Sequence, residues 1–424
     1  MKKSLLVHPN FPTSNKSKNH NNFLPIGLLK LATYLRKCKR ETVKPDQLVW
    51  GEQSISFVPK TIYITSIFTY WAEYVERSIK YYQRLFPKAK VFIGGIFASL
   101  MPEYCKSLGK NIQVFQGIHK EAEKISLEYG PAYDLVDSYG VDYQIIHGMR
   151  GCIRKCKFCG VWKIEEFCSI DVDKLINNIV ISGRKGIIGN KGRNKLVFYD
   201  NNLFANKNIE ILLEKLAKLK INGRNISCES QSGFDGRILV KKAYLAKMLF
   251  NAHFKVPRIA WDHFYEDYPQ IKSQIDLLER AGYNSREIFV FFIYNWDIPY
   301  EEMYKKVKKL WRWKVQISDC RNRPLNQTHD HYNPHMWNFG QTNEDYYIHP
   351  KWSDLKIRAL RKLVRWHNIS IRHLGYQKYN EVYEKLIKEL HPDKIELLEA
   401  NRRHKIQNLS FSKTGIPRLR AFDF

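Results

Sequence analysis

The chain has 424 residues, which is more than one ordinary core needs and favours two domains or a barrel with added parts. Hydrophobic residues make up 44% of the chain, enough to fill such cores, and no run of about 18 apolar residues suggests a membrane-spanning helix. The sequence also lacks the apolar stretch of about 7–15 residues that a secretory signal needs, so we expect a cytoplasmic protein without membrane contacts.

The formal net charge is +28, and the isoelectric point is near 9.6. Such a charge favours a polyanionic partner, above all nucleic acid, because each phosphate that is neutralised releases a counterion. The alternative is a genome composition that enriches Lys and Asn everywhere, since both residues are scattered along the whole chain. The charge alone does not decide between the two interpretations.

The first third of the chain alternates strands and helices. Apolar, β-branched and aromatic segments predict strands at 4–8, 61–67 and 91–93. Apolar residues at helical spacing predict helices at 26–35 and 71–85, and Pro102 opens another short helix. This alternation predicts a doubly wound, Rossmann-like parallel sheet over residues 1–130, in which ligands bind beyond the carboxyl ends of the strands.

A turn-rich segment at 129–139 precedes a second alternation. Strands are predicted at 143–147, 196–199, 226–230, 258–261, 287–294 and 314–318, with helical patterns between them such as 207–219, 270–281 and 299–313. Six strand–helix units predict a partial (β/α)6 barrel of the TIM type over residues 140–325, with its chemistry at the carboxyl rim of the strands. Residues 326–424 are predicted to form a polar and then mainly helical extension.

Four of the eight cysteines lie within residues 152–168. A cytosolic chain of this size gains little from disulfides, so such clustering favours metal or cluster ligation. Cys152, Cys156 and Cys159 are separated by three and two residues and follow the first barrel strand. Three thiolates at this spacing can face one 4Fe–4S cubane and leave its fourth iron open, while Phe158 shields the cluster. The alternative is a zinc site with Cys168 as fourth ligand, which the asymmetric spacing disfavours.

The cysteine triplet and the strand order resemble the radical S-adenosylmethionine superfamily. The resemblance implies that S-adenosylmethionine binds the open iron and that an electron from the cluster cleaves it to a 5′-deoxyadenosyl radical, which abstracts hydrogen from a substrate. It also implies a reducing partner such as flavodoxin or ferredoxin. The residues that would contact S-adenosylmethionine are Phe158, Asp200, Asn201, Ser230, Asp262 and Asn295. The Gly-Gly-Glu stretch of many relatives is missing, and Asp200 and Asn201 stand in its place.

Residues 1–130 resemble the cobalamin-binding domain that precedes the barrel in many enzymes of that superfamily. The resemblance is carried by His8-Pro9, by the 24–28 stretch Leu-Pro-Ile-Gly-Leu and by the paired glycines after 91–93. It implies that His8, Ser66, Gly94 and Gly95 line a cobalamin crevice. The Asp-x-His-x-x-Gly motif does not occur, so cobalamin would bind without the axial histidine of other cobalamin proteins. The alternative is a domain that only packs against the barrel.

Two further stretches are less specific. Residues 182–194 are Gly-rich and basic but lack the phosphate-loop pattern, so a solvated turn is expected there. His329, His331 and His335 follow the last barrel strand, and substrate contact is expected in preference to a second metal site.

The sequence therefore predicts a radical S-adenosylmethionine enzyme, with or without cobalamin-dependent methyl transfer, acting on a substrate that the residues do not identify. An RNA-modifying enzyme of the same superfamily is the first alternative, and the charge favours it. A zinc-stabilised nucleic-acid-binding protein without catalysis is the second.

Overall fold

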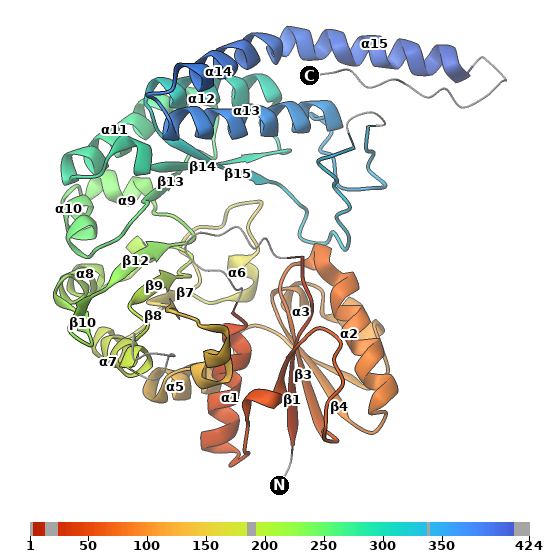
Figure 1. The fold of residues 1–424 in the computed structure, drawn as a ribbon, viewed down its shortest axis with the longest axis vertical. Helices are drawn as coiled ribbons and strands as arrows, with labels where there is room; N and C mark the ends of the chain where they lie inside the picture. Colours follow the sequence, from red (N-terminus) through yellow and green to blue (C-terminus); the bar gives the residue numbers. More distant parts are fainter. Residues whose placement is uncertain (1–2, 13–23, 185–191, 337–339, 411–424) are drawn as a thin grey trace. The chain divides into compact units, whose positions relative to one another are not determined.

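The computed structural model describes residues 3–12, 24–184, 192–336 and 340–410. They form a mixed α/β protein whose three larger sheets are parallel throughout (Figure 1). The chain divides into unit 1, Met1–Lys255 with Pro324–His329, and unit 2, Val256–Arg323 with Asp330–Phe424. Unit 1 thus contains the predicted first domain together with the first half of the predicted barrel. No helix in the described ranges is long and apolar enough to cross a membrane.

Unit 1 begins with a five-stranded parallel sheet in the order β2-β1-β3-β4-β5. The strands are β1 (Ser4–His8), β2 (Leu48–Trp50), β3 (Thr61–Ser66), β4 (Lys90–Gly95) and β5 (Ile112–Phe115). The parallel sheet predicted for this region is confirmed. Because the strand order reverses between β1 and β3, their carboxyl ends flank the switch point at which open α/β sheets bind ligands.

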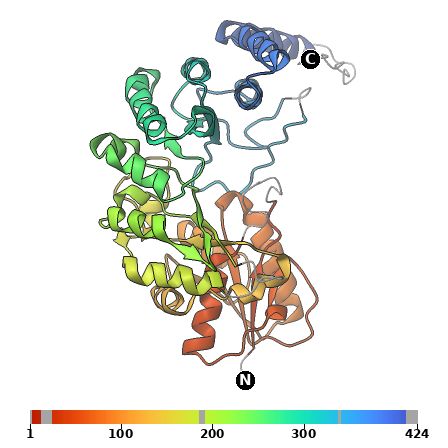
Figure 2. The same cartoon turned by 60° about the vertical axis from the view of Figure 1, so that its left-hand side comes forward.

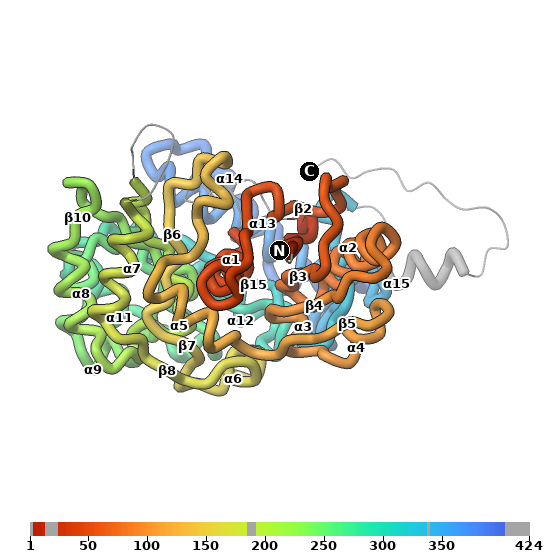
Figure 3. Tube along the Cα trace, turned by 90° about the horizontal axis from the view of Figure 1, so that it is seen from below, coloured from red at the N-terminus to blue at the C-terminus, as the bar shows by residue number. Residues whose placement is uncertain are grey.

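Helices cover both faces of this sheet, as Figure 3 shows for α1 (Ile26–Cys38) and α2 (Ala72–Leu85). Leu6 of β1 joins one core with α1 and α5 (Lys120–Tyr129), whereas Leu5 and Val7 join the other with α2 and α3 (Ile96–Leu100). A strand that is buried on both sides needs a continuous apolar sequence, and all five residues of β1 are buried. The short helix that Pro102 opens is α4 (Pro102–Ser107).

A second parallel sheet of unit 1 has the order β12-β9-β6. Its strands are β6 (Tyr143–Ile146), β9 (Lys195–Phe198) and β12 (Ser227–Ser230), and its helices are α7 (Val172–Arg184), α8 (Ile209–Lys218), α9 (Gly236–Lys241) and α10 (Tyr244–Asn251). Tyr143, Ile145 and Val197 from this sheet belong to the same core as α1. The two sheets of unit 1 therefore share apolar packing. Residues 185–191 of the predicted Gly-rich turn lie outside the described residues.

Unit 2 contains the last three predicted barrel strands as a sheet of its own, in the order β13-β14-β15. The strands are β13 (Arg258–Ala260), β14 (Phe289–Tyr294) and β15 (Gln316–Arg321), with α11 (Tyr268–Ala281) and α12 (Tyr300–Arg312) between them. The predicted helical extension forms α13 (Asp354–Arg372), α14 (Gln377–Glu389) and α15 (Pro392–Ser410), the blue end of the chain in Figure 2. All six predicted strands exist, in two hydrogen-bonded sheets, and the single partial barrel stays a prediction.

Candidate functional site

The three clustered cysteines lie in a long loop closed by a small ladder. β7 (Met149–Arg150) pairs antiparallel with β8 (Cys168–Ser169), and the loop between them contains the short helix α6 (Val161–Ile164). Because β7 follows β6 after two residues, the loop emerges at the carboxyl end of the first strand of the second sheet. The cysteine loop thus follows the strand that the sequence predicts at 143–147.

Gly151 turns the chain at the first residue of this cysteine loop. Its φ is +67°, and a Cβ at this position would lie 2.5 Å from the backbone oxygen of Glu166. Only glycine adopts this turn without moving the neighbouring backbone. The N–H of Gly151 also donates to Oε2 of Glu165 at 3.1 Å, which ties the start of the loop to a residue near its end.

The cysteines are half-buried thiols, and none of them forms a disulfide. Sγ of Cys152 accepts a hydrogen bond from the backbone N–H of Arg154 at 3.3 Å and lies 3.8 Å from Nδ2 of Asn202. The N–H of Cys159 donates to the carbonyl of Cys156 at 3.1 Å and closes a tight turn. N–H donors at a cysteine sulfur suit an iron–sulfur ligand, because they offset the negative charge on the sulfur.

No group of three or more His, Cys, Asp or Glu side chains within the described ranges is gathered so that it could hold a metal ion. Cys168, the fourth ligand of the zinc alternative, is exposed and sits opposite Arg150 in the ladder. The assignment of Cys152, Cys156 and Cys159 to a cluster stays a prediction.

Buried polar side chains gather beside the loop, at the carboxyl ends of β6 and β9. Asp200 is fully buried, and its Oδ1 accepts the N–H of Met149 at 2.6 Å. Oδ2 of Asp200, Oδ1 of Asn202 and Nδ1 of His147 are buried without a hydrogen-bond partner in the part of the chain that the structure describes. Unsatisfied polar atoms are costly to bury, so three of them at one rim indicate that a ligand or water completes the site.

Burial sets the protonation of two of these side chains. It raises the pKa of Asp200 to about 7, although backbone N–H donors oppose the shift. It lowers the pKa of His147 well below the usual value, and the charges of Arg150 and Lys30 lower this pKa further. At neutral pH the rim therefore presents a neutral imidazole and a carboxyl group that is close to half ionised.

A buried ionic chain fixes the loop to the first domain. Nζ of Lys30 on α1 lies 2.7 Å from Oε2 of Glu123 on α5, and Oε1 of Glu123 lies 2.5 Å from Nη2 of Arg150. Arg150 also approaches Glu165, which accepts the amide N–H of Asn201 at 3.1 Å. Burial alone would raise the pKa of Glu123, but Lys30 and Arg150 outweigh burial and lower this pKa to about 2.

Asp235 connects the loop with the third strand–helix unit. Its carboxylate pairs with Arg154 at 3.0 Å, accepts Nδ2 of Asn202 at 3.1 Å and caps α9 through the N–H of Arg237. Its side chain is 5% exposed, so these charge-assisted contacts are shielded from water. Sequence reasoning did not select His147, Asn202, Glu165 or Asp235, since polar residues at strand ends and helix caps are common and only the contacts set these apart.

The residues predicted to contact S-adenosylmethionine fall in both units. Phe158 lies in the cysteine loop, Asp200 and Asn201 follow β9, and Ser230 ends β12, all in unit 1. Asp262 follows β13 in unit 2. The structure therefore brings Asp200 and Asn201 to the rim near the cysteine loop, and the binding role of the whole set stays a prediction.

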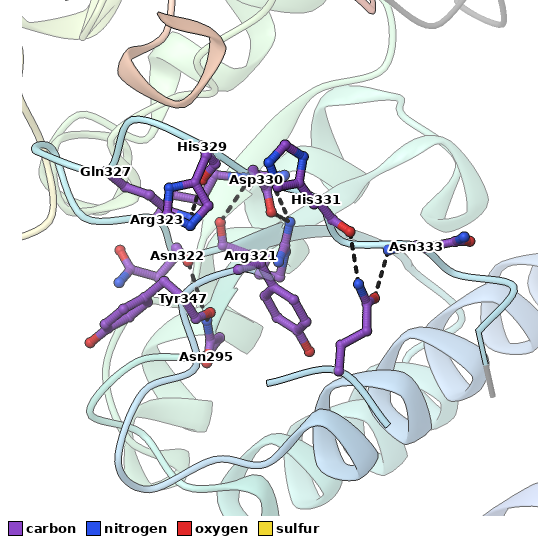
Figure 4. Close-up of polar contacts among 12 residues, drawn as sticks. Asn295, Arg321, Asn322, Arg323, Gln327, His329, Asp330, His331, Asn333 and Tyr347 are labelled. Carbon is purple, nitrogen blue, oxygen red and sulfur yellow. Dashed lines mark hydrogen bonds and ion pairs between the residues drawn. The ribbon is translucent and has the colours of Figure 1, made fainter. Parts of the chain in front are cut away.

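Asn295, the remaining member of that set, holds a loop of unit 2 together. Its Nδ2 donates to the carbonyls of Asn322 at 3.3 Å and Tyr347 at 2.8 Å (Figure 4). Its Oδ1 accepts the N–H of His349 at 2.8 Å. The residue is fully buried with a φ of +57°, a conformation that asparagine tolerates better than most residues. These contacts give Asn295 a structural role whether or not it touches a cofactor.

The predicted cobalamin residues lie at the carboxyl edge of the first sheet, at the ends of β1, β3 and β4. The hydroxyl of Ser66 donates to the carbonyl of Gly94 at 2.9 Å and accepts the N–H of Ala98 at 3.0 Å. Gly95 has a φ of +110°, and a Cβ there would lie 2.0 Å from the oxygen of Ser66. Ser66 and Gly95 thus build the turn from β4 into α3.

His8, at the end of β1, has a buried ring nitrogen, Nδ1, without a hydrogen-bond partner among the described residues. It is buried edge-on against the rings of Phe11 and Trp50, and burial lowers its pKa to about 4. A neutral imidazole with a vacant nitrogen therefore lies at the switch point of the sheet.

The His-rich stretch after β15 is organised by ion pairs. Oδ2 of Asp330 lies 2.5 Å from Nη2 of Arg321 and 2.5 Å from Nε of Arg323, so its carboxylate forms ion pairs with two arginines (Figure 4). Burial opposes the ionised form, but these two arginines lower the pKa of Asp330. His329 and His331 flank this residue in the chain, and their predicted contact with substrate stays a prediction.

No known protein family matches the sequence, and no curated protein matches it. Two solved structures of SuiB from Streptococcus suis show a weak likeness. The one with the precursor peptide SuiA bound has 14% identity and a TM-score of 0.32, over 55% of each chain. The one with S-adenosylmethionine bound has 12% identity and a TM-score of 0.29, over 62% of this chain and 57% of SuiB. The match spans a little over half of SuiB, and at these TM-scores it supports no conclusion about this chain.

Proposed function

We propose that the protein binds a 4Fe–4S cluster through Cys152, Cys156 and Cys159 and cleaves S-adenosylmethionine reductively on it. The observation that carries the proposal is the cysteine loop, in which three thiols at this spacing lie beside a rim of incompletely satisfied polar groups. When bound, the cluster and S-adenosylmethionine supply one-electron cleavage and hydrogen abstraction.

The residues of the chain have two tasks in this proposal. The backbone N–H of Arg154 and the amide of Asn202 offset charge on the sulfur of Cys152. The vacant oxygens of Asp200 and Asn202 accept the ammonium group of S-adenosylmethionine. A cation beside Asp200 favours its ionised form, so binding would draw the pKa of this carboxyl down from about 7.

The surface of the loop suits an acidic electron carrier, in keeping with the flavodoxin or ferredoxin expected from the sequence. Lys155 and Lys157 alternate with the cysteines and are exposed. Ile153 and Trp162 are 48% and 37% exposed, and Nε1 of Trp162 donates to the carbonyl of Cys156. Exposed lysines and exposed apolar side chains in one loop favour brief docking by a negatively charged partner.

The proposal extends to cobalamin at the switch point of the first sheet, which would add methyl transfer to the chemistry. Two observations support this extension: the reversal of strand order between β1 and β3, and the vacant nitrogen of buried His8. Reconstitution with a corrinoid followed by gel filtration tests it. We expect the visible absorption of the corrinoid to elute with the protein, and free elution would exclude the methyl-transfer extension.

The central test is the cofactor content of anaerobically purified protein. We expect about four iron and four sulfide per chain, and 5′-deoxyadenosine after addition of dithionite and S-adenosylmethionine. The Cys156→Ala variant should lose both, whereas Cys168→Ala, which changes an exposed cysteine at the base of the same loop, should retain them. Colourless protein with stoichiometric zinc that Cys168→Ala releases would instead establish the zinc alternative.

A further inference from the structure

Aromatic rings and cations meet on one surface of unit 2, between α12 and the segment that leads from β13 into α11. The aromatic–lysine surface consists of Tyr265, Tyr268, Lys309 and Trp313, and buried Trp261 stacks against two of its rings. A hollow of about 390 Å³ opens there, lined by Tyr268, Lys272, Arg280, Lys309 and Trp313 among others. None of these residues contributes to the contacts around the cysteine loop.

The rings form a rigid stack. The centroid of buried Trp261 lies 5.9 Å from that of Trp313 and 6.0 Å from that of Tyr265, with interplanar angles of 22° and 27°. Lys306 fixes the backbone of this segment, because its fully buried ammonium group donates to the carbonyls of Trp261, at 3.0 Å, and His263. Ring faces held in this way can receive another flat group at little cost in conformational entropy.

Three cations and one acid line the hollow, and two of the cations, Lys309 and Arg280, have no ion pair with a described residue. Nζ of Lys309 lies 4.1 Å from the centroid of Tyr268 and 6.0 Å from that of Trp313, and it forms no ion pair with any described residue. Arg280 is exposed and donates to a backbone carbonyl of Asp276. Asp276, the acid that lines the hollow, already pairs with Lys272. The hollow therefore combines exposed ring surface with a net positive charge.

We propose that the aromatic–lysine surface binds single-stranded nucleic acid. Bases stack on the exposed rings, of which Tyr268 is 37% exposed, while Lys309 and Arg280 contact phosphates. Stacking platforms next to unpaired cations are the two elements that single-strand sites share. The inference adds a partner class to the proposed function, but it rests on residues of unit 2 and not on the cysteines.

Fluorescence anisotropy of the full-length protein with labelled 12-nucleotide oligo(U), oligo(dT) and a duplex of equal length tests the proposal. No cofactor is needed, and Cys156→Ala should bind as the wild type does, so failure of the cluster and failure of this surface are distinguishable. We expect single strands to bind more tightly than the duplex.

Matched variants locate the site. We expect Tyr268→Ala and Lys309→Glu to weaken single-strand binding about tenfold each. The controls are Tyr376→Ala, which removes a ring that is 65% exposed elsewhere on unit 2, and Lys308→Glu, which makes the same charge change one residue away. Each control should change the affinity by about twofold at most. Equal losses for Lys308→Glu and Lys309→Glu, equal affinity for duplex and single strand, or no binding would overturn the proposal.

Discussion

The buried carboxyl group of Asp200 makes the stability of the fold depend on pH. Its folded pKa is about 7 because of burial, above the usual carboxyl value of 3.8. The fold therefore favours the neutral acid, and the contribution of this residue to stability falls as the pH rises from about 4 to 7. Asn at this position keeps an oxygen that accepts the N–H of Met149 and removes the buried charge.

We compare the free energy of unfolding of Asp200→Asn with that of the wild type by urea unfolding. The difference in favour of the variant should grow by about 2–3 kcal/mol as the pH rises from about 5 to 8. The exposed Asp173, changed to Asn, is the control and should follow the wild type. If the free energy of unfolding depended on pH in the same way for Asp200→Asn and the wild type, the pKa of Asp200 would not be raised in the folded protein. If Asp200 also receives the ammonium group of S-adenosylmethionine, the stabilised variant should bind that ligand less tightly.

Gly151 allows a second prediction at the scale of one residue. A methyl group there collides with backbone at 2.5 Å, so Gly151→Ala must displace the start of the cysteine loop. We expect the variant to fold but to hold less than half of the wild-type iron. Gly140→Ala is the matched control, because Gly140 has a similar φ of +63° but nothing within 4 Å of the added methyl group. Iron loss in both variants would point to general destabilisation.

The ionic chain from Lys30 to Arg150 acts at the scale of elements, since it joins α1, α5 and the cysteine loop. Glu123→Gln would leave buried Lys30 without its acid and half-buried Arg150 with Glu165 alone, which costs about 3 kcal/mol. Because the pKa of Glu123 is lowered to about 2, its contribution is present above about pH 4.5 and is lost as the pH falls toward 2. Urea unfolding at pH 7 should show the full loss, and the loss should shrink in acid.

Glu103→Gln is the control for this prediction. Glu103 pairs with Lys106 on the surface, with its side chain 81% exposed, and removal of such a pair changes stability by about 0.5 kcal/mol or less. If Glu123→Gln were equally mild, the ionic chain would not hold the loop in place.

Elements with strong apolar patterns could be predicted from the sequence, and elements that are very short or weakly buried could not. β1 and the six later strands are buried enough to show their pattern. β2 has three residues at the sheet edge, β5 alternates between half-buried and exposed residues at the other edge, and α5 buries little beyond Ala122 and Ser126. β7 and β8 are two residues long and depend on the pairing between them. Short or edge elements of this kind carry no periodic signal.

The same limit applies to the site. The cysteine spacing is local and could be read directly, as could the polar run that contains Asp200 and Asn201. The importance of His147, Asn202 and Asp235 depends on which of their polar atoms have hydrogen-bond partners. Those partners come from distant parts of the chain: Asp235 contacts Asn202, 33 positions away, and Arg154, 81 positions away. No single-sequence pattern contains this information.

At the scale of the whole molecule, the question is whether the charge of +28 acts diffusely or through a local site. A diffuse mode would engage many phosphates and depend very steeply on salt. The aromatic–lysine surface and its hollow present two cations, Arg280 and Lys309, to a single strand, because Lys272 pairs with Asp276 and Glu279. At about 0.7 counterions per phosphate contact, two contacts give a slope of log affinity against log salt concentration of about −1.4.

This slope separates the two interpretations of the composition. We expect wild-type protein to give about −1.4 with a 12-nucleotide single strand between about 50 and 200 mM salt, and Lys309→Glu to reduce the magnitude of the slope by about 0.7. A slope several times steeper, unchanged by Lys309→Glu, would mean that phosphates contact basic residues over much of the surface. The high charge would then act as a general attraction, and the stacked rings of unit 2 would have no special part in binding.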